Sequence, residues 1–331
     1  MSETAQKLKP LKTWSHLSKN RRRPSEYEIV SVGLHFSMND PECAWEQDPD
    51  TYINKWFRKY REGSPVKHDN WDDFRDPDEL VYRTYNIIQD GQENYVDGLI
   101  EEFDALEHDQ GLQPEWVEVL AKLYTPGRYL MHGLQMASAY ITQMAPASTI
   151  TNCATFQAAD SLRWLSHTAY RTKQLSLVWP DYGFVEKERE IWENSPHWQG
   201  FRELMEKALI CYDWCEAFVA VNLILKPAID EACLRQMSHT ARRFDDTLFG
   251  FMADAQLVDS ARSRRWSTTL VQFIQQNEAN QEILDKWVEK WVPLGDAAID
   301  TYCAALPDSP SAADDAKRDC WSFRAGLGLS A

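Results

Sequence analysis

Residues 144–172 form a stretch of small and hydroxyl-bearing residues with only three charged ones, Asp160, Arg163 and Arg171. Small side chains let two helix backbones approach each other closely. Bulky residues between them are expected to supply buried volume: Ile150, Phe156, Leu162, Leu165 and Tyr170. The stretch therefore predicts a long helix that packs tightly against a neighbouring helix.

Helical periodicity continues over most of the chain. Asp76 with Pro77 is typical of a helix N-terminus. The apolar residues after it recur at spacings of three, four or seven and predict one buried helix face: Val81, Tyr85, Ile88, Tyr95, Leu99, Phe103 and Leu106. Further helices are predicted at 114–144 with a kink near Pro126, over the block at 144–172 with an end at Trp179 and Pro180, at 198–226 up to Pro227, at 228–277 and at 279–304. No segment alternates with the period of two that a half-buried strand requires. The predicted fold class is all-α, with long central helices as in a ferritin-like bundle.

The predicted helices form one domain, residues 76–306, and the segments on either side of it differ in composition. Residues 1–75 contain five prolines and many aromatic residues but no sustained helical period. Such a segment fits an extended N-terminal arm that becomes ordered on a partner subunit. The residues predicted for this partner interface are Trp14, His16, Arg21, Arg22, Arg23, Tyr27, Trp45 and Trp56. Residues 307–331 are polar and predict a loose C-terminal tail.

Composition excludes several classes of protein. The net charge of −16 lacks the basic surface that a nucleic-acid-binding protein needs. The longest apolar run, at 217–225, contains Asn222 and is too short to cross a membrane. Seven cysteines, an odd number, follow an N-terminus without an apolar signal segment, which predicts free thiols and a cytoplasmic location.

Metal-ligand spacing gives the decisive test for a ferritin-like bundle. A di-iron site in such a bundle uses a Glu on each of two helices and Glu-x-x-His on each of the other two. None of the eight histidines has Glu or Asp three residues before it; Tyr129 precedes His132, and Trp164 precedes His167. The sequence therefore predicts a bundle without a di-iron site, in which His132 and His167 are hydrogen-bonded core residues.

One motif supports an alternative. Asp72, Asp73 and Asp76 spell the aspartate-rich DDxxD motif of terpene synthases, all-α enzymes that bind Mg²⁺ and a substrate diphosphate with it. Pro77 follows at once, so the acids precede the predicted helix and do not lie along it. A stand-alone terpene cyclase is the alternative to a subunit without a site of its own.

The chain also resembles the β subunits of the hydroxylases of bacterial multicomponent aromatic (toluene/o-xylene-type) monooxygenases. Five blocks carry the resemblance: TWSHL at 13–17, RRRPSEYEIVS at 21–31, SPVKHDNWDDFRDPDELVYRTYNIIQDGQE at 64–93, MAPASTITNCATFQAADSLRWLSHTAYRT at 144–172 and RSRRWSTTLV at 262–271. The resemblance as a whole covers residues from about 11 to 305.

The resemblance implies a non-catalytic structural subunit of an aromatic-hydrocarbon-degrading complex. In that family a ribonucleotide-reductase-like bundle without metal braces an α subunit that hydroxylates arenes with O₂ at a di-iron centre. The implied hydroxylase is α2β2γ2. Electrons from NADH reach it through an FAD- and iron–sulfur-containing reductase and a Rieske ferredoxin, and an effector protein also binds it. No catalytic, cofactor-binding or metal-binding residue is implied for this chain.

Overall fold

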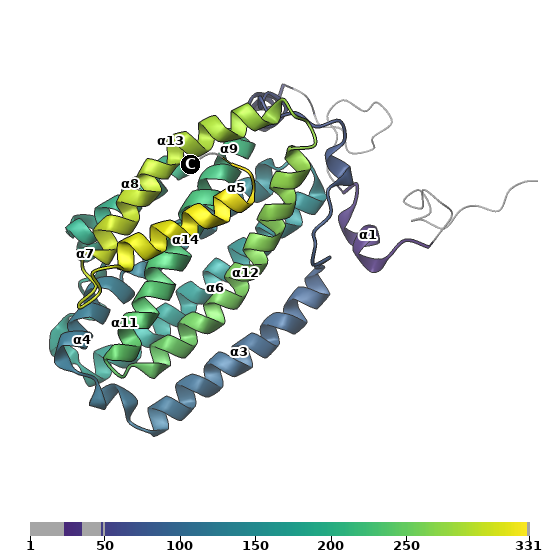
Figure 1. The fold of residues 1–331 in the computed structure, drawn as a ribbon. Helices are drawn as coiled ribbons and strands as arrows, with labels where there is room; N and C mark the ends of the chain where they lie inside the picture. The colour runs from purple at the N-terminus through teal and green to yellow at the C-terminus, as the bar shows by residue number, and fades with distance from the viewer. Residues whose placement is uncertain (1–22, 35–47, 49, 330–331) are drawn as a thin grey trace, which may run out of the picture.

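The computed structural model describes residues 23–34, 48 and 50–329, and every regular element within them is a helix (Figure 1). The all-α prediction is therefore confirmed. The long helices are α3 (Tyr82–Ala105), α5 (Gly127–Met144), α6 (Ser148–Val178), α8 (Pro196–Leu209), α12 (Thr247–Ile274), α13 (Asn280–Cys303) and α14 (Ala312–Gly326). The shorter ones are α1 (Glu26–Ser31), α2 (Tyr52–Phe57), α4 (Pro114–Val119) and α7 (Glu188–Asn194).

The predicted small-residue helix is α6, which pairs with α5 along its length. A short link at 145–147 reverses the chain between them, and Ala154 on the shared face is fully buried. The prediction is wrong for two of the bulky residues, because Leu162 and Tyr170 lie exposed on the far side of α6. The small residues, not the bulky ones, determine which side of α6 faces α5.

One continuous helix of residues 214–243, here called the central helix, runs through the core. It comprises α9 (Trp214–Phe218), α10 (Lys226–Ala228) and α11 (Met237–Arg243), joined by π-helical turns at Val219–Leu225 and Ile229–Gln236. The predicted helix at 198–226 starts close to α8 but is wrong beyond it, because the helix breaks at 210–213 and continues past Pro227. Asp213 starts a new helix by accepting the Cys215 and Glu216 N–H groups, and Pro227 does not end it. The π-helical turns on both sides accommodate a residue that has no N–H to donate.

Helices α8, α13 and α14 form an outer layer beside the central helix (Figure 1). The prediction of a loose C-terminal tail is wrong, because residues 312–326 form α14 and pack on α13 and the central helix. Its buried face consists of three small residues spaced by four, Ala312, Ala316 and Cys320, followed by Arg324. A face of this kind adds little hydrophobicity to a polar segment, so composition alone indicates disorder.

Helix α3 lies along the edge of the bundle against α12 (Figure 1). It begins at Tyr82, five residues after the predicted start, so Asp76 is not its N-cap. The buried Asp76 carboxylate instead accepts the Asp78 and Leu80 N–H groups at 3.0 and 3.1 Å and closes a turn. The apolar face is also wrong in part, because Ile88 and Tyr95 are exposed.

The predicted 75-residue arm is wrong for its described second half. Phe57, Val66 and Phe74 are buried in the main hydrophobic core of the same chain. Residues 50–75 thus belong to the bundle, because their aromatic side chains find apolar surface within this subunit. Residues 1–22 and 35–47 lie outside the described part of the chain. No helix within the described residues is long and apolar enough to span a bilayer.

Candidate functional site

Helices α5, α6, α12 and the central helix surround a layer of uncharged polar side chains, here called the neutral layer: Ser138, Gln157, Asn222, Ser263 and Ser267. Gln157 is its centre. Its amide nitrogen donates to Ser138 at 3.0 Å, and its amide oxygen accepts from Asn222 at 2.8 Å and Ser263 at 2.6 Å. Asn222 also donates to Ser267 at 2.9 Å. One hydrogen-bonded set therefore joins all four helices.

A second buried cluster, here called the ion quartet, joins α6 to α12. It consists of Asp160 and Arg163 on α6 and Asp259 and Arg262 on α12. Each Asp lies three residues before an Arg on its own helix and pairs with the Arg of the other: Arg163 donates to Asp259 at 2.9 Å, and Arg262 to Asp160. Two carboxylates and two guanidiniums balance each other in charge, as buried ions require.

The surroundings shift the pKa values of the two carboxylates in opposite directions. Burial, reinforced by the nearby Asp259 charge, raises the pKa of Asp160 to about 6, although Arg262 opposes the rise. Burial would also raise the pKa of Asp259, but the Arg262 and Arg163 charges and hydrogen bonds from Gln89 and Trp164 bring it below its usual value. Asp259 is therefore the firmly ionised member of the quartet.

Helix α3 is attached to the bundle through this quartet. Gln89 donates to Asp160 and to Asp259, each at 3.0 Å, and the Tyr85 hydroxyl donates to Asp160 at 2.8 Å. One turn further along α3, Glu93 pairs with Arg163 at 2.7 Å and with His167 at 3.0 Å. The polar groups of the quartet thus fix both the α6–α12 contact and the position of α3.

The residues present do not fit a di-iron centre. Iron in a ferritin-like bundle needs several carboxylates and imidazoles directed at one point. The interior positions of the neutral layer carry amides and hydroxyls instead, and the carboxylates of the quartet are held by arginines. Among the described residues no group of three or more His, Cys, Asp or Glu side chains is placed to hold a metal ion.

The prediction that His132 and His167 are hydrogen-bonded core residues holds for one of the two. His167 is buried and hydrogen-bonded to Glu93, as predicted. The prediction for His132 is wrong, because its side chain lies on the exposed side of α5. The sequence analysis also missed the quartet. Its signal was present as two Asp-x-x-Arg pairs, Asp160 with Arg163 and Asp259 with Arg262, at the i, i+3 spacing that places both side chains on one face.

Two of the predicted partner-contact residues are used within this chain. Tyr27 is buried and its hydroxyl accepts the Asp76 N–H at 2.9 Å. Trp56 donates its indole N–H to the Tyr140 hydroxyl at 3.0 Å and packs on Tyr60 with ring centroids 4.5 Å apart. The partner-contact prediction is wrong for Tyr27 and remains a prediction for the half-buried Trp56. Arg23 is exposed. The remaining members, Trp14, His16, Arg21, Arg22 and Trp45, lie outside the described residues.

The aspartate-rich motif does not form the site that a terpene cyclase needs. Asp72 and Asp73 lie in a single 3₁₀ turn, Trp71–Asp73, ahead of any long helix. The Asp76 carboxylate accepts hydrogen bonds from two backbone N–H groups of its own turn. The alternative of a stand-alone cyclase therefore has no structural support.

Known proteins define the class. Residues 56–278 match the Methane/Phenol/Alkene Hydroxylase family. The chain is 53% identical to the hydroxylase component β subunit of the toluene-4-monooxygenase system of Ectopseudomonas mendocina, over 90% of this chain and 91% of that protein. It is 26% identical to the oxygenase component of a phenol 2-monooxygenase from Pseudomonas sp. (strain CF600), over 71% of this chain and 70% of that protein. The chain belongs to this hydroxylase family.

Solved structures agree on the fold. A toluene 4-monooxygenase structure with toluene in its resting active site contains a chain with a TM-score of 0.86 and 53% identity, matching 90% of this chain and 98% of that one. A chain of phenol hydroxylase from Pseudomonas sp. OX1 superposes with the same TM-score of 0.86 at 15% identity, over 100% of this chain and 98% of that one. The ferritin-like prediction is confirmed.

We expect the purified chain to contain less than one-tenth of an iron atom per molecule. The reason is the ligand chemistry: the neutral layer offers amides and hydroxyls, which bind iron poorly beside carboxylate and imidazole. Elemental analysis of the chain expressed alone in iron-supplemented medium tests this. Stoichiometric iron that survives gel filtration would contradict it.

Proposed function

We propose that this chain is the non-catalytic, structural β subunit of the hydroxylase component of a bacterial aromatic-hydrocarbon monooxygenase of the toluene/o-xylene type. The observation that carries the proposal is the 53% identity to a toluene-4-monooxygenase β subunit over nine-tenths of both chains. The neutral layer supports it, because a bundle closed by amide and hydroxyl hydrogen bonds offers no reactive group to a substrate.

The proposal extends to the whole enzyme. The catalytic di-iron centre belongs to a partner α subunit, where O₂ is used to hydroxylate the arene, and a γ subunit completes an α2β2γ2 assembly. NADH, FAD and iron–sulfur centres of separate electron-transfer proteins, including a Rieske ferredoxin, supply electrons. An effector protein binds the hydroxylase mainly through α. The complex works in the cytoplasm.

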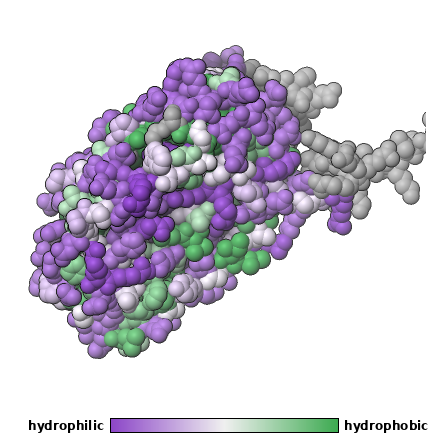
Figure 2. All heavy atoms as spheres, in the orientation of Figure 1, coloured by the Kyte–Doolittle hydropathy of each residue, from purple (hydrophilic) through white to green (hydrophobic). Residues whose placement is uncertain are grey.

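We place one partner contact on α3. An exposed line of residues, here called the α3 stripe, consists of Ile88, Gly91, Tyr95 and Gly98. Ile88 and Tyr95 are 42% and 48% exposed and lie seven residues apart, and no atom lies within 4 Å of where a Cβ on Gly91 or Gly98 would stand. Figure 2 shows apolar side chains gathered along this edge of the molecule.

The glycines make the stripe informative. A glycine in an exposed helix interior costs about 1 kcal/mol relative to alanine. Gly91 and Gly98 lie seven residues apart beside exposed apolar residues, and no contact within the described part of this chain offsets that cost. Without side chains, they allow the backbone of another helix to approach closely. The stripe therefore fits a helix of the α subunit.

The test is co-expression of the tagged chain with untagged α and γ subunits. We expect the wild-type chain to recover an iron-containing complex of hexamer mass. The double variant Ile88→Glu/Tyr95→Glu should lower its recovery at least tenfold, because two unpaired carboxylates would be buried at the contact.

Asn86→Glu is the control for an added carboxylate, since it places one negative charge at an exposed position on another side of α3. It should assemble like the wild type. Normal assembly of the double variant would rule out the α3 stripe as the contact. Failure of the wild-type chain to recover any iron-containing partner would instead overturn the proposed function.

A further inference from the structure

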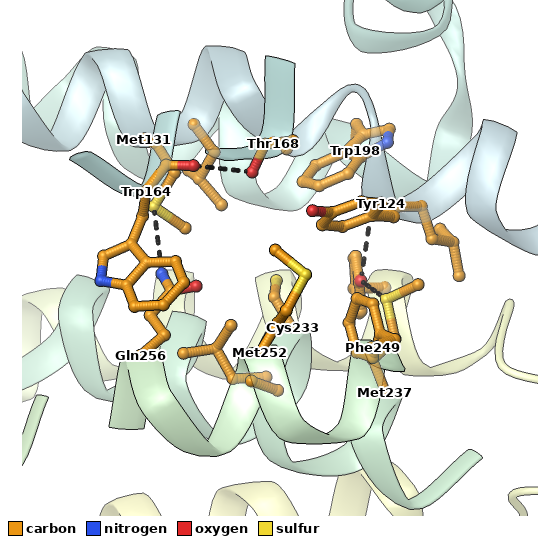
Figure 3. A pocket seen from close by; sticks show the side chains of 16 residues that line it. Tyr124, Met131, Trp164, Thr168, Trp198, Cys233, Met237, Phe249, Met252 and Gln256 are labelled. Atoms are coloured by element: carbon orange, nitrogen blue, oxygen red, sulfur yellow. Dashed lines mark hydrogen bonds between the residues drawn. The ribbon is translucent and has the colours of Figure 1, made fainter. Parts of the chain in front are cut away.

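Two cavities adjoin each other inside the bundle. The larger, of about 40 Å³, lies between α5, α6, α12 and the central helix (Figure 3). The smaller, of about 20 Å³, is lined in part by Gln157 of the neutral layer and Asp259 of the ion quartet. Met131, Trp164 and Gln256 line both cavities, and the two together are here called the chamber.

Lys226 brings an unused hydrogen-bond donor to the smaller cavity. This lysine lies on the central helix, lines the cavity and is buried. Its ammonium group has three N–H donors. Two of them donate to the Asp230 carboxylate and the Ser260 hydroxyl, and the third has no acceptor within the described residues. A charged donor that is left unpaired in the interior is costly, so this N–H calls for a partner.

Gln256 on α12 brings an unused acceptor to the same place. Its amide nitrogen has the Met131 sulfur as its partner at 3.7 Å, and a thioether is a weak acceptor. Its amide oxygen accepts no hydrogen bond from the described part of the chain. Figure 3 shows this amide directed at the open space. A water molecule in the smaller cavity would satisfy the Lys226 donor and the Gln256 acceptor together.

The larger cavity has polar groups of its own. Figure 3 shows the Tyr124 hydroxyl directed at the open space from the side opposite Gln256. Burial raises the pKa of Tyr124 to about 12, so this hydroxyl keeps its proton. The Thr168 hydroxyl donates to the Trp164 carbonyl at 2.8 Å and keeps lone pairs with which it accepts. Polar groups therefore face the chamber at both ends and in the middle.

The volumes fit water. A cavity holds one water molecule once about 10–15 Å³ is open to the centre of a water-sized sphere, and buried water usually makes two to four hydrogen bonds. The smaller cavity, at about 20 Å³, has room for one molecule, and the larger, at about 40 Å³, for about two. An apolar guest of the same size would leave the Lys226 donor unpaired.

We propose that the chamber is a binding site for a row of about three ordered water molecules, the first of which bridges the Lys226 ammonium group and the Gln256 amide. The site goes beyond the proposed function and does not rest on it. It lies among the four helices of the bundle, where a ferritin-like protein with iron holds its metal ions. In this chain an ammonium group and the water that it binds take the place of a metal ion as the interior cation.

The first test is diffraction from crystals of the full chain, with and without xenon pressure. We expect electron density for a water molecule about 2.7–3.2 Å from both the Lys226 nitrogen and the Gln256 amide oxygen. The same water should remain under xenon. Xenon in its place, or a direct Lys226–Gln256 hydrogen bond without water, would overturn the proposal.

The second test is made in solution on the chain with ¹³C-methyl-labelled methionine. Magnetisation transferred from water should reach the methyl groups of Met131 and Met252, which line the chamber. It should not reach Met144, which is fully buried and does not line it. Equal transfer to all three methyl groups, or transfer to none, would contradict a hydrated chamber.

Gln256→Met removes the bridging amide and keeps a side chain of similar length. The occupancy of the Lys226 water should fall below half, and the transfer to Met131 should drop at least twofold. Gln272→Met is the matched control, the same change at an exposed position of α12, and should alter neither. Full occupancy in Gln256→Met would show that Gln256 does not hold the water. The two wild-type measurements decide the proposal even where a variant folds poorly, and they use the chain without its partners.

Discussion

Asp259→Asn should lower the free energy of unfolding of the chain by about 3–5 kcal/mol, the usual cost of removing one partner of a buried ion pair. The carboxylate accepts from Arg163 at 2.9 Å, Arg262 at 3.1 Å and the Trp164 indole at 2.8 Å. An amide at the same place carries no charge, so one guanidinium in the quartet loses its balancing charge in a site from which water is excluded. The midpoint of urea unfolding, followed by circular dichroism, measures the loss.

Asp254→Asn is the matched control, because Asp254 also lies on α12 and also pairs with an arginine, Arg242. Its side chain is 55% exposed, and exposed ion pairs contribute at most about 1 kcal/mol. Adding Arg163→Gln to Asp259→Asn should restore part of the lost stability, since the pair couples. A loss for Asp259→Asn as small as that of the control would show that the quartet does not hold α6, α12 and α3 together.

The helices were predictable because their signals are local. The small residues of the block at 144–172 identified α6, which spans Ser148–Val178. Helix starts were less predictable. An Asp followed by Pro suits both a helix N-cap and a separate turn, and the Asp76 side chain bonds the same type of N–H group in either. The choice between N-cap and turn depends on how Tyr27 and Leu80 pack around Asp76 in the folded chain. That packing cannot be read from the sequence.

The central helix was less predictable for a different reason. Its residues are buried on nearly every side, so apolar residues do not alternate with polar ones at a helical period. Pro227 then indicated a break. The two π-helical segments that carry the chain past it have no sequence signal of their own.

The two buried polar clusters were predictable only in part. Each Asp-x-x-Arg pair is visible as a spacing of three, but their pairing is not. Arg262 reaches Asp160 across 102 positions of the chain, and the α6–α12 contact that allows this is a property of the whole bundle. The same holds for Gln157, which meets Ser263 across 106 positions. The lack of Glu-x-x-His can be read directly from the sequence, because that motif is local.

The second large effect concerns the close crossing of α8 and α13 at Gly200. Gly200→Ala should destabilise the chain by about 2–3 kcal/mol, a typical cost of overpacking. A Cβ at Gly200 would stand 2.6 Å from the Ala298 Cα and 2.8 Å from the Ala297 carbonyl oxygen. Both are backbone atoms, so α13 as a whole must move away, and the buried Trp198 and Tyr302 beside the crossing lose contact. Thermal and urea unfolding of the purified variant measure the cost.

Gly98→Ala makes the opposite prediction from the same chemical change. The position lies within α3, and an added Cβ meets nothing within 4 Å. Alanine should therefore stabilise the isolated chain by about 0.5–1 kcal/mol, the difference in helix propensity. If both variants stabilised the chain, helix propensity and not the α8–α13 approach would govern these glycines. If Gly98→Ala stabilised the isolated chain but weakened the complex with α, that glycine would be retained for a helix crossing between subunits, as Gly200 is for one within the chain.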